Sequence, residues 1–247
     1  MEENILKFKG SISVKAVLES GRRKCRMLYV DGKKRSRDFA YIIAQAKKRN
    51  VPVVVCDKPK LNELADGPCA GILLEAETRD IPDLSIDLPF EGFAAFVDGV
   101  EDPYNLGSIT RTLYAAGCSL LILPRRNWDY SESTIVKASA GAWEKMNIVM
   151  LEDVQILAEW KNRAGLKMVC AERKDAVSLF DYSFAFSTLE VIGGSRRGIH
   201  ADLLEQSDAN VYIHYGREYK NALDAPSAAA VMAFAWTRQY PYMKKED

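Results

Sequence analysis

Histidine is scarce in this 247-residue sequence, which contains two, and the five cysteines are scattered without a Cys-x-x-Cys pair. These shortages argue against a zinc site and against a disulfide framework, so we assign no metal ligands and expect a reducing, cytoplasmic location. No apolar run approaches the ~20 residues of a membrane span, so we expect no membrane partner. The N-terminal sequence has no hydrophobic core of the kind found in signal peptides, which predicts that the protein is not secreted.

Net charge is absent as well, because 34 basic residues balance 34 acidic ones, but the charge is unevenly distributed. The first 60 residues contain 16 lysines and arginines and only 6 aspartates and glutamates. Clustered basic charge indicates a polyanionic partner such as RNA. An ordinary solvated surface is the alternative interpretation.

Helical and strand patterns alternate along the chain, which predicts an α/β protein. We expect a small basic α/β domain at 1–78, a linker at 79–91 that is aperiodic and contains two prolines, and a second domain with a mostly parallel sheet at 92–247. In the second domain the patterns predict strands at 93–98, 120–124, 167–172, 190–194 and 210–215, helices at 107–117, 131–143, 152–164 and 200–206, and a last helix capped by Asp224.

The first strand of the second domain is followed by a turn with an unusual set of polar residues. Asp102, Pro103, Asn105 and Gly107 lie in this predicted turn, and Arg111 lies on the first turns of the helix after it. An arginine that reaches back over the strand end suits a phosphate or carboxylate, and open α/β sheets bind ligands at this edge. A structural βα turn beside a surface arginine is the alternative.

The same stretch, DGVEDPYNLGSITRTLYAAGC, resembles the first signature of the SpoU/TrmH-type RNA ribose 2′-O-methyltransferases of the SPOUT class. The block KASAGAWEK at 137–145 resembles the next signature of that family. Glu144 in this block is interpreted as a support residue of the site or, equally, as a solvent-facing helix residue. The resemblance implies an L30e-like N-terminal α/β domain for substrate binding, followed by a parallel-sheet SPOUT domain with a deep trefoil knot. It also implies a homodimer formed through the C-terminal domain.

The resemblance further implies S-adenosylmethionine as the cofactor, held largely by main-chain groups of loops near the knot. Ser195 stands where the family has glutamate, and Ala222 and Asp224 stand where it has serine and asparagine. Asp224 is equally well interpreted as a helix N-cap, and one residue can serve both purposes. The residues assigned to the cofactor are Gly193, Gly194, Ser195, Gly198, Ile213, Tyr215, Gly216, Leu223 and Asp224.

Arg111 and Asn105 are the catalytic residues that the resemblance implies. Arginine stays charged at physiological pH, so Arg111 would grip the ribose-phosphate and lower the pKa of the 2′-hydroxyl, while Asn105 positions Arg111 or the ribose. Arg196 and Arg197 are candidates for a phosphate site, with a solvated loop as the alternative interpretation. His214 is a candidate general base, for which we favour a structural role.

The sequence therefore predicts an enzyme that methylates the 2′-oxygen of a ribose in structured RNA, with ribosomal RNA as the expected substrate. The alternatives are a non-catalytic RNA-binding relative that has lost cofactor use, and an unrelated α/β nucleotide-binding enzyme. Phosphate contacts of the first domain would supply affinity for RNA. They are assigned to Arg22, Arg23, Lys24, Arg26, Lys33, Lys34, Arg35 and Arg37.

Overall fold

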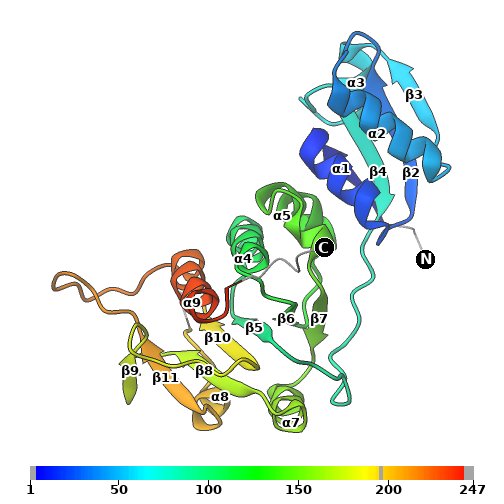
Figure 1. Cartoon of the computed structure of the whole chain (residues 1–247). Helices are drawn as coiled ribbons and strands as arrows, with labels where there is room; N and C mark the ends of the chain where they lie inside the picture. The colour runs from blue at the N-terminus through cyan, green and yellow to red at the C-terminus, as the bar shows by residue number, and fades with distance from the viewer. Residues whose placement is uncertain (1–3, 195–196, 242–247) are drawn as a thin grey trace. The chain divides into compact units, whose positions relative to one another are not determined.

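The computed structural model describes residues 4–194 and 197–241, and the chain divides into two compact units (Figure 1). Unit 1 comprises the residues up to 80 together with 127–145, and unit 2 comprises 81–126 together with the residues from 146 onward. The predicted α/β class is confirmed, with a smaller N-terminal sheet and a C-terminal parallel sheet. Residues 127–145 differ from our expectation, because they group with unit 1 and not with the C-terminal unit.

Unit 1 is built on a four-stranded sheet with the strand order β1-β4-β2-β3. Strand β4 runs antiparallel to both of its neighbours, while β2 and β3 pair in parallel. The alternation of strands and helices agrees with the sequence pattern, and β1 is an additional strand that we did not predict. The elements are β1 (Ile5–Lys9), α1 (Ser11–Ser20), β2 (Cys25–Asp31), α2 (Arg37–Lys48), β3 (Val53–Cys56), α3 (Lys58–Leu64) and β4 (Ile72–Glu77).

The segment 127–145 adds the 3-10 helix η1 (Asp129–Ser131) and the helices α5 (Glu132–Ala138) and α6 (Ala142–Lys145) to unit 1. We expected one helix here, but the chain turns at Ala140 and Gly141, whose φ angles are 50° and 84°. A side chain at Gly141 would place its Cβ 2.5 Å from the Cβ of Ala16 in α1. This close approach requires glycine, and it lets the segment pack against α1 and β1.

A buried charge network ties this segment to the rest of unit 1. The buried guanidinium of Arg23 lies 2.5 Å from Oε2 of Glu132 and 2.7 Å from Oε1 of Glu144. Burial opposes the charge, but the attraction of Glu144 and Glu132 outweighs it and raises the pKa of Arg23. The assignment of Arg23 to RNA binding is therefore wrong, because its charge is used inside the protein. Glu144 is fully buried in this network, so the alternative of a solvent-facing position is wrong, while its support of the catalytic site stays a prediction.

Unit 2 is built on a seven-stranded sheet, in which every pairing is parallel, with the order β7-β6-β5-β10-β8-β11-β9. The predicted strands are all present, and β7 and β9 are short strands that the sequence reading missed. The strands are β5 (Phe93–Asp98), β6 (Leu120–Pro124), β7 (Ile148–Leu151), β8 (Lys167–Ala171), β9 (Ala176–Ser178), β10 (Thr188–Gly193) and β11 (Ala209–Tyr212).

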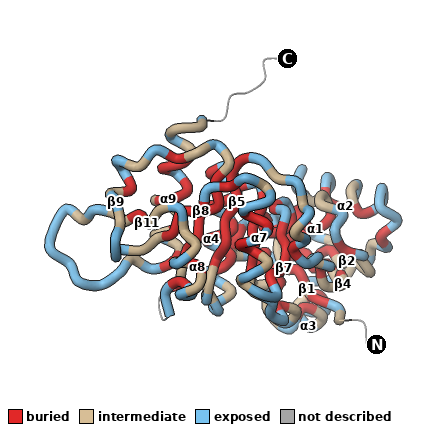
Figure 2. The backbone as a smooth tube through the Cα atoms, turned by 90° about the horizontal axis from the view of Figure 1, so that it is seen from below, coloured by how far each residue is buried: buried red, intermediate tan, exposed pale blue. Residues whose placement is uncertain are grey.

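Helices cover both faces of this sheet, with α4 and α9 on one face and α7 and α8 on the other (Figure 1). Parallel strands that are covered on both faces consist of nearly continuous apolar residues, as in β5 and β10. The core accordingly lies along the central strands (Figure 2). The helices are α4 (Pro103–Ala115), α7 (Val154–Ala164), α8 (Ala201–Glu205) and α9 (Ala225–Gln239).

The stretch predicted as a linker has little regular structure, but part of it packs on unit 2. Leu84 is buried in the core of unit 2, and its amide donates to the carbonyl of Met150 in β7 over 2.8 Å. Leu88 and Phe90 pack against the same core. In the part of the chain that the structure describes, no helix has the length and apolar character needed to cross a membrane.

Candidate functional site

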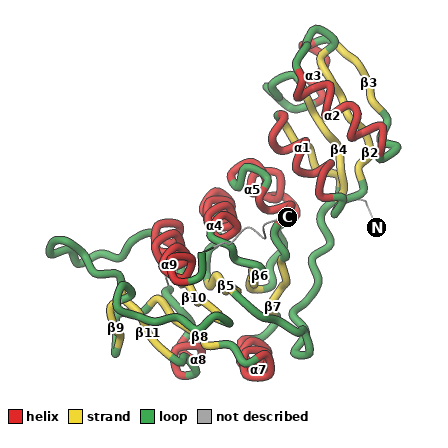
Figure 3. Tube along the Cα trace, in the orientation of Figure 1, coloured by secondary structure: helices red, strands yellow, loops and turns green. Residues whose placement is uncertain are grey.

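The strands of unit 2 end in loops (Figure 3). Two cavities lie among these strand ends and the loops after them. The first, called the strand-end cavity, has a volume of about 260 Å³ and is bounded by the loops after β8, β10 and β11. The second, called the helix-start cavity, has a volume of about 530 Å³ and is bounded by the loop after β5 and the first residues of α4 and α9. Gly194 lines both cavities, so two ligands bound in them would meet at this residue.

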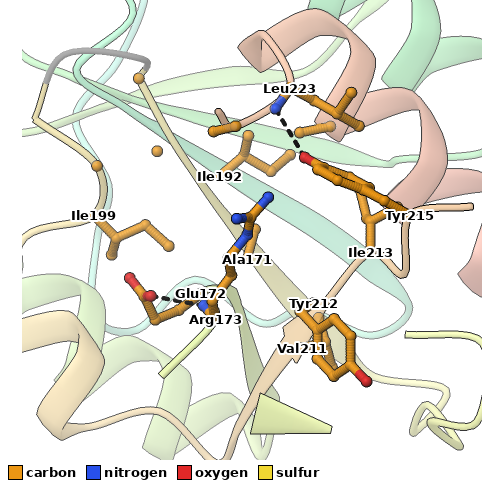
Figure 4. A pocket seen from close by; sticks show the side chains of 15 residues that line it. Ala171, Glu172, Arg173, Ile192, Ile199, Val211, Tyr212, Ile213, Tyr215 and Leu223 are labelled. Carbon is orange, nitrogen blue, oxygen red and sulfur yellow. Dashed lines mark hydrogen bonds between the residues drawn. The ribbon is translucent and has the colours of Figure 1, made fainter. Parts of the chain in front are cut away.

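The strand-end cavity brings together most of the residues that we assigned to the cofactor (Figure 4). Gly216 does not line the cavity, Asp224 lines the helix-start cavity instead, and Ser195 lies outside the described residues together with Arg196. The assigned residues that do line the strand-end cavity are Gly193, Gly194, Gly198, Ile213, Tyr215 and Leu223.

The loop after β8 is the part of this cavity that sequence reasoning missed. Glu172 and Arg173 of this loop line the cavity, together with Ala171 at the end of β8. No motif marks them, and only the position of β8 between β10 and β11 in the sheet brings them to the site. The other lining residues outside our assignment are Ile192, Ile199, Val211, Tyr212, Ala222 and Ala228.

Two glycines in the wall of the strand-end cavity allow neighbouring main-chain segments to lie close together. A Cβ at Gly193 would lie 2.5 Å from the carbonyl carbon of Gly198, and a Cβ at Gly194 would lie 2.4 Å from the carbonyl oxygen of Gly99. Side chains are therefore excluded at both positions. The remaining wall is largely aliphatic, as Ile192 and Ile213 illustrate in Figure 4. A cavity with apolar walls and accessible main-chain groups suits a nucleoside-like ligand.

The polar residues that follow β5 were expected in a turn, but most of them lie in the first turns of helix α4. Asp102 is the N-cap of α4, because its Oδ1 accepts a hydrogen bond from the amide of Asn105 over 2.8 Å. Pro103 takes the first helical position, where its missing N–H costs nothing. The helix thus begins four residues earlier than predicted, and Gly107 is buried within it. At the start of this helix, Asp102, Pro103 and Asn105 line the helix-start cavity.

Arg111 does not reach back over the strand end as we predicted. It is the ninth residue of α4 and lies about 9 Å along the helix axis from Asn105, since each residue rises 1.5 Å. Its side chain is exposed and makes no hydrogen bond or ion pair with the described residues, and it lines neither cavity. Arg111 and Asn105 are therefore not brought together within one chain.

The helix-start cavity is polar and contains charges of both signs. Arg126 and Arg197 line it, and Nη1 of Arg126 lies 3.6 Å from Oε1 of Glu101. Asp224 also lines it and acts as the N-cap of α9, since its Oδ1 accepts from the amide of Ser227 over 2.7 Å. The hydrogen bonds from Ser227 lower the pKa of Asp224, so its carboxylate is charged at neutral pH. The cap interpretation is confirmed, and the residue also faces a cavity.

Neither histidine lines the strand-end cavity or the helix-start cavity. The amide of His200 donates to Oδ2 of Asp98 over 2.9 Å, which ties the loop after β10 to the end of β5. His214 is exposed. Burial strongly raises the pKa of Glu190 in β10, but this carboxyl lies outside both cavities and is no candidate for catalysis.

The remaining residues assigned to RNA lie on unit 1. Lys24 and Arg26 both form an ion pair with Glu77. The side chain of Lys24 is largely exposed, and that of Arg26 is half-buried. Arg22 is exposed and donates a hydrogen bond to the carbonyl of Lys145. Four exposed residues lie between the end of β2 and the first residue of α2 and are called the basic loop: Lys33, Lys34, Arg35 and Arg37.

Two family models match the chain and together cover most of it. Residues 92–234 match the SpoU rRNA Methylase family, and residues 10–81 match the family described as RNA 2′-O ribose methyltransferase substrate binding. The mitochondrial rRNA methyltransferase 1 of Schizosaccharomyces pombe is 26% identical over 266 residues, which cover 92% of this chain and 87% of the relative.

Solved structures show the same fold. The SpoU methyltransferase AviRb from Streptomyces viridochromogenes, in complex with its cofactor AdoMet, superposes with a TM-score of 0.78 at 21% identity, covering 96% of this chain and 91% of that one. The AdoMet-bound rRNA methyltransferase from Sinorhizobium meliloti superposes with a TM-score of 0.79 at 20% identity, covering 97% of this chain and 89% of that one.

Proposed function

The chain belongs to the SpoU rRNA Methylase family, and from this membership we propose that it transfers a methyl group from S-adenosylmethionine to a ribose 2′-oxygen in structured RNA. The observation that carries the proposal is the pair of cavities that share Gly194. One cavity has the apolar, main-chain-rich wall that a nucleoside requires, and the other has the charged wall that suits a ribose-phosphate. A reaction that joins two ligands needs two such sites side by side.

The strand-end cavity fits the cofactor because its walls match the chemical parts of that molecule. At Gly193 and Gly194 the main chain lies so close to neighbouring main chain that a Cβ atom would not fit, so main-chain groups form this part of the wall. Ile192, Ile213 and Leu223 supply apolar surface for an adenine ring. S-adenosylmethionine, when bound, supplies an electrophilic methyl group on a sulfonium centre. Ala222 and Asp224, which differ from the family signature, do not interrupt this wall. Ala222 lines the strand-end cavity, and Asp224 lines the helix-start cavity.

The residues of the chain act on the other reactant, a ribose hydroxyl that is a weak nucleophile at neutral pH. Asn105 and Asp224 lie in the helix-start cavity and can orient this hydroxyl through hydrogen bonds. Arg126 and Arg197 line the same cavity and can bind the flanking phosphates. Arg111 carries a permanent positive charge, which would grip the ribose-phosphate and lower the pKa of the hydroxyl.

A homodimer fits this mechanism and is part of the proposal. Arg111 lies outside both cavities of its own chain, so it can approach a reacting ribose only where a second copy or the RNA covers α4. The helices α4 and α9 pack side by side and expose aromatic side chains at Tyr104, Tyr114 and Phe234. Exposed aromatic residues on adjacent helices suit an interface between protein chains. We also propose that the chain of unit 2 forms the trefoil knot that the family resemblance predicts.

Ribosomal RNA is the proposed substrate, with the cytoplasm as the proposed location. The name of the Schizosaccharomyces pombe relative supports rRNA, and the match of residues 10–81 to the substrate-binding family supports an RNA-binding role for unit 1. The five cysteines are free, which suits a reducing compartment.

The proposed function is tested by calorimetric titration with S-adenosylmethionine and S-adenosylhomocysteine. We expect micromolar or tighter binding with one site per chain, followed by transfer of labelled methyl groups to ribosomal RNA. An absence of binding, both with and without RNA, would overturn the proposal and favour an RNA-binding relative without catalysis.

Neutralising the basic loop is expected to weaken RNA binding about 10–100-fold and to lower the salt slope of log K by about 2–3, because up to four phosphate contacts are lost. The variant carries Lys33→Gln, Lys34→Gln, Arg35→Gln and Arg37→Gln, and binding is measured by filter retention at several KCl concentrations. Since all four residues are exposed, the melting temperature is expected to remain unchanged.

A charge-matched control removes four other exposed lysines of unit 1, namely Lys47, Lys48, Lys58 and Lys60. Equal losses of affinity in both variants would show that RNA responds to total charge only. The assignment of phosphate contacts to the basic loop would then fail.

A further inference from the structure

The loop between β11 and α9 forms one wall of the strand-end cavity although it has no regular structure. Its two ends line the cavity through Ile213 and Tyr215 on one side and Ala222 and Leu223 on the other. The residues between them, 216–221, are exposed. An exposed loop of this length orders its ends only when specific contacts join them, because each fixed residue loses backbone entropy.

Tyr215 joins the two ends of this loop. Its hydroxyl accepts a hydrogen bond from the amide of Leu223 over 3.1 Å (Figure 4). Leu223 precedes the N-cap of α9, so this bond connects the start of the loop to the start of the helix. Tyr215 therefore fixes the distance between the two cavity-lining arms.

Arg173 reaches the same loop from the end of β8. Its guanidinium carbon lies 4.9 Å from the centre of the Tyr215 ring, in a cation–π contact. Its Nη2 donates to the carbonyl oxygen of Asn221 over 3.4 Å. Arg173 thus contacts both arms of the loop, one through a ring and the other through a main-chain oxygen.

The backbone of Arg173 is itself held in place. Oε1 of Glu172 accepts hydrogen bonds from the amides of Arg173 and Lys174, over 2.6 Å and 3.2 Å. Glu172 and Arg173 both line the strand-end cavity. The side chain of Arg173 therefore extends to the loop from a turn that Glu172 holds in place.

We propose that Arg173 and Tyr215 form a clip that orders the loop 213–223 over the strand-end cavity and so sets the affinity for S-adenosylmethionine. The inference rests on the proposed function only for the identity of the ligand. Arg173 and Tyr215 are positioning residues, so the clip acts on binding and not on the chemical step.

Arg173→Met is expected to raise the Kd for S-adenosylhomocysteine about tenfold, because a cation–π contact and a hydrogen bond are lost. The KM for S-adenosylmethionine should rise by a similar factor, while kcat at saturation stays within about twofold. Arg173→Lys keeps the charge but loses the planar donor fork, so an intermediate Kd is expected. Calorimetry and initial rates measure these quantities.

The matched control is Arg217→Met in the same loop. Arg217 is exposed and makes no hydrogen bond or ion pair with the residues that the structure describes, so its removal should leave the Kd unchanged. In a double-mutant cycle, Arg173→Met and Tyr215→Leu should be non-additive, since each removes the same contact. Full additivity would overturn the clip.

A second readout does not depend on any ligand. Lys220 lies in the exposed part of the loop and is a site for trypsin, so a loosened loop should be cut about tenfold faster at this residue in Arg173→Met than in the parent chain. Equal cleavage rates together with equal Kd values would overturn the clip while leaving the proposed function in place. If the parent chain binds no cofactor, the proposed function fails, and the cleavage rates alone decide whether the clip orders the loop.

Discussion

Replacing Arg111 with alanine is expected to lower kcat for ribose methylation about 10²–10³-fold, the loss found when one charge-stabilising donor is removed from an active site. The physical reason is the permanent positive charge of arginine, which lowers the pKa of a nearby hydroxyl without needing to accept its proton. The affinity for S-adenosylhomocysteine should stay the same, because Arg111 does not line the strand-end cavity. Methyl transfer to RNA under single-turnover conditions measures the effect.

The fold should be unaffected by this change. Arg111 is exposed on α4 and has no hydrogen bond or ion pair with the described residues, so the melting temperature should remain within about 1 °C. Arg163→Ala is the control, since this exposed arginine of α7 lies on the other side of the sheet. Normal methylation by the Arg111 variant would contradict the mechanism proposed for this residue.

Mixing two inactive variants separates the two ways in which Arg111 can reach a ribose. A bulky side chain at Gly194 would collide with the carbonyl of Gly99 and block both cavities, as in Gly194→Val. If Arg111 serves the cavity of a second copy, mixed dimers of the Arg111 and Gly194 variants should regain activity. No recovery would place Arg111 on RNA bound to its own chain.

Replacing Arg23 with alanine is expected to destabilise unit 1 by about 3–5 kcal/mol, the usual cost of removing one partner from a buried ion pair. Glu132 and Glu144 would remain buried without the guanidinium that neutralises them. The urea midpoint followed by tryptophan fluorescence should fall sharply, and RNA binding should be lost only when the unit unfolds.

The neighbouring arginine provides the comparison for this prediction. Arg22 is exposed, so Arg22→Ala should change the free energy of unfolding by about 0.5 kcal/mol or less. Equal effects of the two substitutions would contradict the structural role of Arg23. The triple variant Arg23→Met, Glu132→Leu and Glu144→Leu should recover much of the lost stability, because it removes the buried charges together.

Much of this protein could be predicted from local sequence. The apolar runs of β5 and β6 predicted both strands with their observed bounds, since a strand buried on both faces has nearly continuous apolar residues. Asp224 was predicted as a helix cap, because the required side-chain acceptor and the proline after it are local signals. The strand-end glycines at 193 and 194 were also recognised, by motif.

Other features depended on residues that are distant in sequence. The break at Gly141 follows from its contact with Ala16, which no local pattern contains. The loop after β8 enters the site only because β8 lies between β10 and β11 in the sheet. Helix α4 begins four residues earlier than predicted, so Arg111 lies farther along the helix than expected and away from the strand end.

The sequence by itself determined the α/β class, the main strands, the N-cap of α9 and the family signatures, because these depend on residues within a few positions of one another. Only the tertiary structure decided which charges are available to a ligand. Arg22 and Arg23 are adjacent and chemically identical, yet one is exposed and the other is neutralised by Glu132 and Glu144, more than 100 residues away. Burial and pairing belong to the packed chain, so no property of a single residue type predicts them.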